Sequence, residues 1–273
     1  MTLERCGPVV LVGAGKMGGA LLEGWLAKGL PAQRIYVQDP APPDECAAII
    51  SRNAIALNKP LETLPDPALV LLAVKPQVMD QVLDGLKALV RPGTAFLSIA
   101  AGRTVASMAQ RLGEDTAIIR TIPNTPAAIG RGITVAFAGE GVSGAQRELA
   151  SGLLAAVGDV VWVDEEGLID AATAVSGSGP AYVFYLVECL AQAGIAAGLD
   201  KDAAAKLARV TVEGAGELLH QSALAPETLR KNVTSPGGTT QAALEVLSRD
   251  GGLPDIMRDA VLAALKRARE LAQ

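Results

Sequence analysis

The chain has 273 residues, a length that fits one large domain or two ordinary ones. Half of the residues are hydrophobic but only 3% are aromatic, so the core must consist mainly of Ala, Val, Leu and Ile, as in helices packed on a parallel sheet. The net charge is −5 and the sequence has no basic run, so we do not expect nucleic acid as a partner.

The cysteines and the N-terminus indicate the compartment. Cys6, Cys46 and Cys189 lack the spacing of a disulfide framework or of a metal site, which predicts a reducing compartment and no bound metal. Charged residues precede the first short apolar run, so we do not expect a signal peptide. The most apolar long stretch, 181–199, contains a glutamate and is expected to be a buried helix, not a membrane span. We therefore predict a cytoplasmic protein.

The first predicted elements are an apolar strand, a turn with the spacing Gly13-x-Gly15-x-x-Gly18, and a helix. A dinucleotide pyrophosphate requires this order, because the N-terminus of the helix offers unpaired N–H groups to the anion. Gly13 permits the turn, Gly15 lets the backbone approach the phosphates, and Gly18 lets the helix pack close to the strand. An acidic residue, Asp39, follows the next strand. This context predicts dinucleotide binding, against the alternative of a glycine-rich turn that binds nothing.

Strands and helices alternate as far as residue 164. This pattern predicts a Rossmann-type doubly wound parallel sheet, with ligands beyond the carboxyl ends of its strands. Three loops of small or polar residues fall at such ends, at 73–76, 100–102 and 123–126. The expected strands cover 9–12, 35–38, 55–57, 68–74, 94–100, 117–122, 133–138 and 160–163. The expected helices cover 16–30, 44–53, 78–90, 105–112 (capped by Thr104) and 143–157.

Nearly every segment from residue 165 to 273 has helical periodicity. We therefore predict two domains, an α/β dinucleotide-binding domain of residues 1–164 and an all-helical domain of residues 165–273. Several of the later helices are apolar on more than one face and must be buried. Because a domain of this size has few fully interior helices, we expect a homodimer through them. The segments 171–175, 182–186 and 191–197 carry almost no charge. All the helices expected in this half cover 168–175, 181–198, 203–221, 240–248 and 254–271, with loops at 176–180 and 232–240.

The second glycine-rich loop, 235–240 (SPGGTT), precedes a helix. Its N–H groups would form a pocket for a carboxylate or a phosphate, with Thr239 or Thr240 as the cap, although an ordinary capped helix start is the alternative. Lys75 is either an acid or a solvated contact to a ribose. The only histidine, His220, lies late in a helix, and no Ser/His or His/Asp pair can be assembled. Hydride transfer to an already electrophilic carbon is consistent with this lack of catalytic pairs, because the cofactor carries out the difficult step and the side chains only position the substrate.

Five sequence blocks, spread over nearly the whole chain, together resemble the pyrroline-5-carboxylate reductase family in order and spacing. They are 13–18 (GAGKMG), 73–77 (AVKPQ), 120–126 (RTIPNTP), 176–182 (SGSGPAY) and 232–240 (NVTSPGGTT). The resemblance implies an NAD(P)H-dependent oxidoreductase that reduces the C=N bond of 1-pyrroline-5-carboxylate to L-proline, the last step of proline biosynthesis. It also implies a homodimer built by the helical domain and assembled further into a ring, such as a pentamer of dimers.

The resemblance also implies roles for particular residues. It places the substrate carboxylate against Asn232, Ser235, Gly238, Thr239 and Thr240. Thr240 matches the threonine that hydrogen-bonds the ring nitrogen, which makes it the catalytic candidate. With the glycine turn and the strand-end loops, the expected cofactor contacts are Gly13, Ala14, Gly15, Lys16, Met17, Gly18, Asp39, Asn58, Ala73, Val74, Lys75, Pro76, Ala100, Ala101, Gly102, Pro123 and Asn124.

The residues agree with this chemistry and depart from the family in one place. A protonated cyclic imine accepts hydride without a strong acid, so we expect the nicotinamide from the sheet side and the imine from the helical side to meet in one cleft. Many family members have a polar or Asn-Arg pair after the second strand, which suits a 2′-phosphate, whereas this chain has Gln38-Asp39-Pro40. A carboxylate accepts from a free ribose 2′-OH and repels a phosphate. The cofactor is therefore NADPH or NADH, with better use of NADH than in a typical NADPH-preferring member.

Two other interpretations stay open at this point. The β-hydroxyacid dehydrogenase and imine reductase group also joins a Rossmann domain to a helical domain, but it usually presents a lysine or a comparable donor in the interdomain helix. Here the helix from residue 181 has no lysine before Lys201. A nucleotide-sensing or scaffold protein would bind NAD(P) without turnover, but it has no need for a carboxylate pocket at 235–240.

Overall fold

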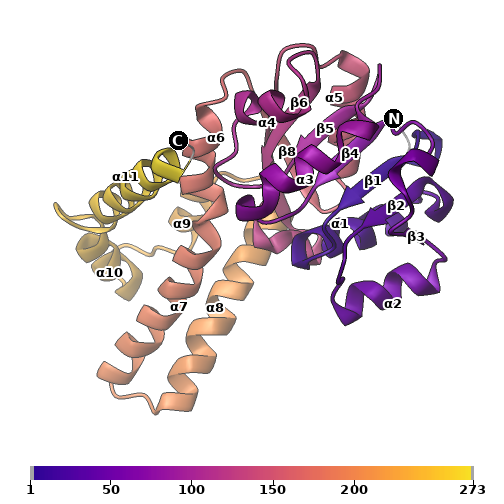
Figure 1. The fold of residues 1–273 in the computed structure, drawn as a ribbon. Helices are drawn as coiled ribbons and strands as arrows, with labels where there is room; N and C mark the ends of the chain where they lie inside the picture. The colour runs from indigo at the N-terminus through magenta and orange to yellow at the C-terminus, as the bar shows by residue number, and fades with distance from the viewer. Residues whose placement is uncertain (1–2, 272–273) are drawn as a thin grey trace. The chain divides into compact units, whose positions relative to one another are not determined.

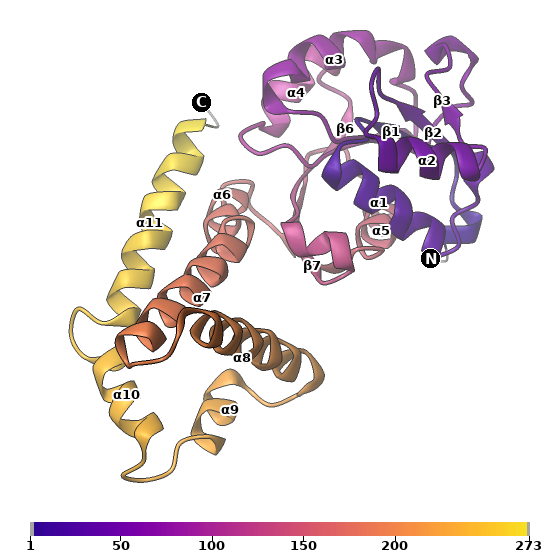
Figure 2. The ribbon, with the colours of Figure 1, turned by 90° about the horizontal axis from the view of Figure 1, so that it is seen from below.

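The computed structural model describes residues 3–271. The chain divides into two compact units (Figures 1 and 2). The first unit comprises the residues up to Ser178 together with the chain from Ala264 onward, and the second comprises Gly179–Ala263. Each unit is described below by itself. The functional boundary at residues 164 and 165 remains a prediction.

The first unit contains an eight-stranded sheet in the order β3-β2-β1-β4-β5-β6-β7-β8. Its first six strands follow the order 3-2-1-4-5-6 of dinucleotide-binding folds, which confirms the predicted fold class. The strands are β1 (Val9–Val12), β2 (Ile35–Gln38), β3 (Ala56–Leu57), β4 (Leu69–Leu72), β5 (Ala95–Ser98), β6 (Ala117–Ile122), β7 (Gly132–Ala138) and β8 (Gly158–Val163).

One pair of strands departs from the expected parallel sheet. β6 and β7 are antiparallel, with Ile119 opposite Ala138 and Ile122 opposite Val135, whereas β7 and β8 are parallel. The reason is the short connection between them, residues 123–131, which holds only a 3₁₀ turn. A parallel pair needs a longer crossover, usually with a helix.

Helices cover both faces of this sheet (Figure 2). The alternation of side chains along β1 shows the two layers, because Val9 and Leu11 pack with α1, α2 and α5, whereas Val10 and Val12 pack with α3 and α4. Buried runs on both faces are what a doubly wound sheet requires. The helices are α1 (Lys16–Ala27), α2 (Asp44–Arg52), α3 (Met79–Gly85), α4 (Val105–Leu112), α5 (Gly144–Leu154) and α6 (Leu168–Ala172).

Helix ends follow local signals, with two departures from expectation. The predicted cap of α4 is confirmed, since the Thr104 hydroxyl accepts from the Ser107 N–H at 3.1 Å. α1 ends at Ala27, earlier than expected, and the chain turns at Gly29 with φ +84°. The helix expected over 78–90 is broken into α3 and a 3₁₀ turn, Lys87–Leu89.

The loop expected at 176–180 is wrong, because this segment is helical. A π-helical turn, Thr173–Gly177, follows α6, and α7 begins at Gly179. The Ser178 N–H donates to the Thr173 carbonyl at 2.8 Å, which is the wider π-type spacing. Pro180 is tolerated because it lies in the first turn of α7, where its missing N–H would have no helical partner.

The second unit is helical, as predicted, and α7 lies along α8 (Figure 1). α9 was not predicted, although Pro226 at its start is a normal helix signal. Among residues 3–271, the structure has no helix that is long and apolar enough to cross a membrane. The helices are α7 (Gly179–Ala196), α8 (Lys201–Gln221), α9 (Pro226–Asn232), α10 (Thr239–Ser248) and α11 (Leu253–Leu271), the last of which continues into the first unit.

Candidate active site

The glycine turn between β1 and α1 has the geometry that its sequence predicts. Gly13 has φ +92°, and a Cβ there would lie 2.7 Å from the Ala73 carbonyl oxygen. A Cβ on Gly18 would overlap the Gly13 carbonyl oxygen, so this glycine allows α1 to pack against the turn. A Cβ on Gly15 would meet no heavy atom of the described chain within 4 Å. Two of the glycines are therefore needed by the fold, and the third leaves open space at the helix start.

This helix start is suited to an anion. Gly15 is the N-cap of α1 and has no side chain to cap the first turn, whose N–H groups have no partner within the helix. An open hollow of about 490 Å³ lies beside it. Its lining residues are Ala14, Gly15, Lys16, Gly19, Ala20, Glu23, Pro43, Glu45, Cys46, Ile49 and Ala128.

Asp39 is held against the same turn. Its carboxylate accepts from the Ala14 N–H at 2.6 Å and from the Ala41 N–H at 2.8 Å. Asn58, at φ +51°, brackets the backbone of Asp39, since its Oδ1 accepts from the Asp39 N–H at 2.9 Å and its Nδ2 donates to the Asp39 carbonyl at 2.7 Å. The side chain of Asn58 thus braces Asp39, and a direct contact between Asn58 and the cofactor remains a prediction.

Burial and charge also act on a thiol of the hollow. Burial raises the pKa of Cys46, and the nearby charge of Asp39 raises it further. This cysteine is therefore a neutral thiol at neutral pH. Within residues 3–271, no group of three or more His, Cys, Asp or Glu is placed to hold a metal ion.

The strand-end loops lie where the sheet topology puts them, after β4, β5 and β6. Lys75 is exposed and precedes a 3₁₀ turn that begins at Pro76. Gly102 has φ +73°, which few other residues adopt. The amide of Asn124 is used inside the protein, because Oδ1 accepts from the Ile133 N–H at 2.9 Å and Nδ2 donates to the Ser176 carbonyl at 3.2 Å. Its side chain therefore fixes the loop, and a contact between Asn124 and the cofactor remains a prediction.

The second glycine-rich loop lies between α9 and α10. Gly237 has φ +69°, its N–H donates to Gln241 Oε1 at 2.7 Å, and the Gly238 N–H donates to the Ser235 carbonyl at 3.0 Å. Gly238 is the N-cap of α10. The expected cap at Thr239 or Thr240 is wrong, because these residues already belong to the helix.

This correction strengthens the case for an anion pocket. A glycine cap leaves the first N–H groups of α10 without a side-chain oxygen of the cap residue to accept from them. Thr239 is exposed and Thr240 is half-buried in this first turn. The five residues predicted to bind substrate all lie within 232–240 in the second unit, whereas every predicted cofactor contact lies in the first.

Comparison with known proteins identifies the family. The chain is 40% identical over 266 residues to the pyrroline-5-carboxylate reductase of Pseudomonas aeruginosa, covering 97% of both chains. It is 36% identical to the corresponding protein of Arabidopsis thaliana, covering 97% of this chain and 95% of that one. The chain belongs to the pyrroline-5-carboxylate reductase family. The resemblance found in the sequence blocks is thereby confirmed.

Family models match both parts of this reductase-family chain. Residues 166–271 match "Pyrroline-5-carboxylate reductase dimerisation", and residues 8–102 match "NADP oxidoreductase coenzyme F420-dependent". A solved pyrroline-5-carboxylate reductase from Coxiella burnetii has a TM-score of 0.91 at 34% identity, covering 98% of this chain and 100% of that one. The enzyme of Plasmodium falciparum, solved with NADP bound, has a TM-score of 0.80 at 25% identity, with 99% of both chains covered. The family thus shares both the nucleotide-binding sheet and the dimerisation helices.

Proposed function

We propose that this chain reduces 1-pyrroline-5-carboxylate to L-proline with a reduced nicotinamide dinucleotide. The observation that carries the proposal is the pair of glycine-lined helix starts, at α1 and at α10, in a chain of this family. Each presents N–H groups to an anion, and the reaction involves two anionic partners, a pyrophosphate and a carboxylate.

The first unit holds the cofactor in this proposal. The start of α1 binds the pyrophosphate, the open space at Gly15 admits it, and Asp39 lies at the end of β2, where the ribose hydroxyls bind in such folds. The cofactor fits this cradle because a Cβ at Gly15 would meet no heavy atom of the described residues within 4 Å, so the backbone at the helix start is open to a ligand. The reduced nicotinamide supplies the hydride.

The second unit holds the substrate. The first N–H groups of α10 and the hydroxyls of Ser235 and Thr239 bind the carboxylate, while Thr240 hydrogen-bonds the ring nitrogen and fixes the orientation of the imine. A protonated C=N group is already electrophilic. The protein therefore needs no acid of perturbed pKa and acts by binding and orientation.

The cofactor is NADPH or NADH, and we propose that this chain uses NADH better than a typical NADPH-preferring member of the family does. A phosphate on the ribose would be repelled by the carboxylate of Asp39, and residues 39–45, which also include Asp44 and Glu45, contain no basic side chain to offset this charge. A kcat/KM for NADPH tenfold or more above that for NADH would contradict this. Asp39→Asn removes the charge and keeps one oxygen for the Ala14 N–H, although it loses the acceptor for the exposed Ala41 N–H. It should shift the ratio toward NADPH by a factor of about ten, or about 1.4 kcal/mol.

One assay tests the main proposal. Purified protein is supplied with the imine and with NADH or NADPH, loss of the reduced cofactor is followed by absorbance, and proline is identified chromatographically. Imine-dependent oxidation with stoichiometric proline is expected. Turnover of open-chain hydroxyacids in place of the imine would favour a β-hydroxyacid dehydrogenase, and cofactor binding without turnover would favour a nucleotide sensor.

We also propose that the helices of the second unit pair with those of a second copy, as the dimerisation match suggests. A ring of such dimers, such as a pentamer, and a cytoplasmic location remain part of the proposal. Sedimentation of the purified protein tests the assembly, and a monomer at micromolar concentration would overturn it.

A further inference from the structure

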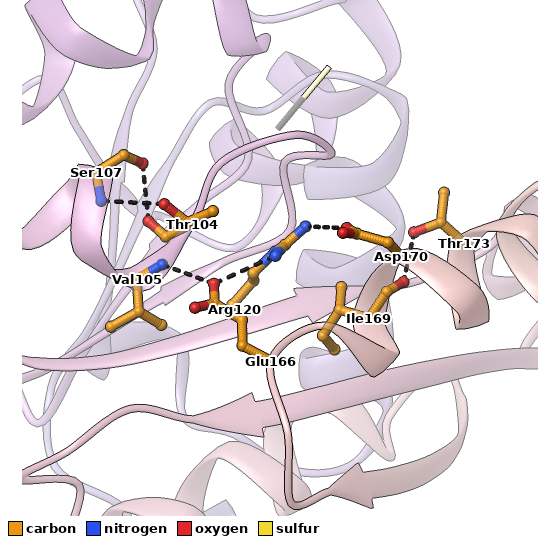
Figure 3. Close-up of polar contacts among 8 residues, drawn as sticks. All are labelled: Thr104, Val105, Ser107, Arg120, Glu166, Ile169, Asp170 and Thr173. Atoms are coloured by element: carbon orange, nitrogen blue, oxygen red, sulfur yellow. Dashed lines mark hydrogen bonds and ion pairs between the residues drawn. The ribbon is translucent and has the colours of Figure 1, made fainter. Parts of the chain in front are cut away.

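A buried guanidinium lies in the first unit, in none of the segments predicted to contact cofactor or substrate. Arg120 belongs to β6, and only 3% of its side chain is exposed. Its Nη2 donates to Asp170 Oδ1 at 2.6 Å, and its Nη1 donates to Glu166 Oε1 at 3.2 Å (Figure 3). Both carboxylates come from the segment that follows β8. One strand of the sheet therefore holds this segment by two charge-assisted hydrogen bonds.

The same cluster reaches the start of α4. Glu166 Oε1 also accepts from the Val105 N–H at 2.8 Å, beside the Thr104 cap (Figure 3). The N-terminus of α4 carries a partial positive charge, which offsets part of the extra negative charge of two carboxylates around one guanidinium. α4 directly follows the 100–102 loop, one of the proposed cofactor contacts. Glu166 thus links the start of α4 and the segment before α6 to the same cation.

Asn124, four residues after Arg120, holds the other end of the segment that follows β8. Asn124 donates to the Ser176 carbonyl inside the π-helical turn. We call residues 166–178 the connector, because the family's dimerisation match begins at 166 and the first compact unit ends at Ser178. Arg120 fixes the start of the connector and Asn124 its end.

We propose that Arg120 is a positioning residue for hydride transfer. By fixing the connector on the sheet, it sets the point at which the chain leaves the first unit, and through Glu166 it ties that point to the start of α4, which follows the proposed cofactor loop. This inference rests on the proposed function. A buried ion pair adds little stability compared with apolar residues of similar volume. We therefore assign to this cluster the role of holding the connector in one defined position on the sheet. Hydride transfer is sensitive to that geometry, since a displacement of about 1 Å can cost about a hundredfold in rate.

Asp170→Asn tests the proposal, because the amide oxygen still accepts from Arg120 but the charge is lost. We expect kcat per folded protein to fall by about tenfold to a hundredfold, while the dissociation constant of NADH stays close to wild type. The midpoint of thermal unfolding should fall, because the buried guanidinium loses one of its two charged partners, so all assays are run well below that midpoint. We also expect a larger primary isotope effect on kcat with cofactor deuterated at the transferred hydride, since a misplaced hydride makes this step more rate-limiting. Arg120→Lys should give the same pattern, because an ammonium cannot bridge the two carboxylates as the guanidinium fork does.

Asp66→Asn is the matched control, since it removes a carboxylate from an exposed pair with Arg91 at 3.6 Å and should leave all four measurements unchanged. An unchanged kcat and isotope effect in Asp170→Asn would overturn the proposal. A loss of kcat that only follows the loss of folded protein would also overturn it, because the cluster would then be purely structural. If the wild-type protein fails to turn over the imine, the proposed function itself is wrong, which the variants do not decide.

Discussion

The two units bury their apolar side chains to very different degrees. In the first unit, β1, β4 and β5 are buried along their whole length, and Trp25 is fully enclosed with its indole N–H donating to the Leu153 carbonyl at 2.9 Å. Within 179–263, all of which the structure describes, the only buried apolar side chains are those of Ala204 and Ala208. On α7, Val183, Leu186 and Leu190 are all more than two-fifths exposed.

The first unit therefore has a complete hydrophobic core of its own, and the second unit does not. A helical unit that leaves leucines and aromatic rings in water cannot offset the conformational entropy of folding by itself. Its apolar surface must be covered, and the family's dimerisation match over 166–271 supports a second copy as the cover. The stability of the first unit should therefore not depend on protein concentration, whereas that of the second unit should depend on pairing with a second copy.

The largest expected effect comes from a charge on the exposed stripe of α7. Leu186→Asp should place an unpaired carboxylate in the interface and lower activity at nanomolar protein by at least about a hundredfold, equivalent to about 2.7 kcal/mol of association. Sedimentation should show dissociation. Val161→Asp, at an aliphatic residue of β8 that is 45% exposed, is the control and should keep the assembly intact. An oligomer that survives Leu186→Asp would refute the contrast between the units.

The next largest effects are those of substitutions at two glycines of the first unit, which should differ in whether they change stability as well as cofactor binding. Gly15→Val should weaken cofactor binding by about thirtyfold or more, equivalent to about 2 kcal/mol, without changing the unfolding midpoint, because its Cβ points into open space. Gly18→Ala should weaken binding and also destabilise the unit by about 1–3 kcal/mol, since its Cβ overlaps the Gly13 carbonyl. Titration calorimetry and thermal unfolding measure both. Unchanged binding in Gly15→Val would remove the assignment of the pyrophosphate to this turn.

Local patterns were sufficient to predict much of this molecule. The apolar run before Gly13 predicts a buried strand followed by a helix, and the structure confirms β1 and α1. The strand-end loops follow from chain order, because parallel strands end at one edge of the sheet. Glycine spacing alone also predicts that Gly13 and Gly18 have no room for a side chain.

Long-range pairings could not be predicted in the same way. Arg120 stands out as a charge within an apolar strand, but its partners Glu166 and Asp170 lie 46 and 50 residues further on. The glycines around the π-helical turn predict a loop from the sequence. The structure is helical there because the bonds that hold the turn include one from Asn124, which lies far away in the sequence. The side chain of Asn58 similarly braces Asp39, which no spacing rule suggests.

A smaller effect is expected in the substrate loop. Thr240→Ala removes one hydroxyl from the first turn of α10 and should lower kcat by about tenfold, the worth of one hydrogen bond of about 1.4 kcal/mol. Cofactor affinity should not change, because every predicted cofactor contact lies in the other unit. Thr239→Ala, at the exposed neighbour, should raise KM more than it lowers kcat. Equal losses of turnover and cofactor affinity in Thr240→Ala would give Thr240 a structural role.

The smallest effect is a difference in thiol labelling between the units. Cys6 and Cys46 are buried in the first unit, and burial raises the pKa of both thiols, so neither should react with a disulfide reagent at neutral pH in the folded protein. Cys189 is exposed on α7 of the single chain and should react. If a second copy covers α7, Cys189 should react faster in Leu186→Asp than in wild type. Equal rates would mean that the partner leaves this face of α7 in water, and the interface would then have to lie on the other exposed helices of the unit.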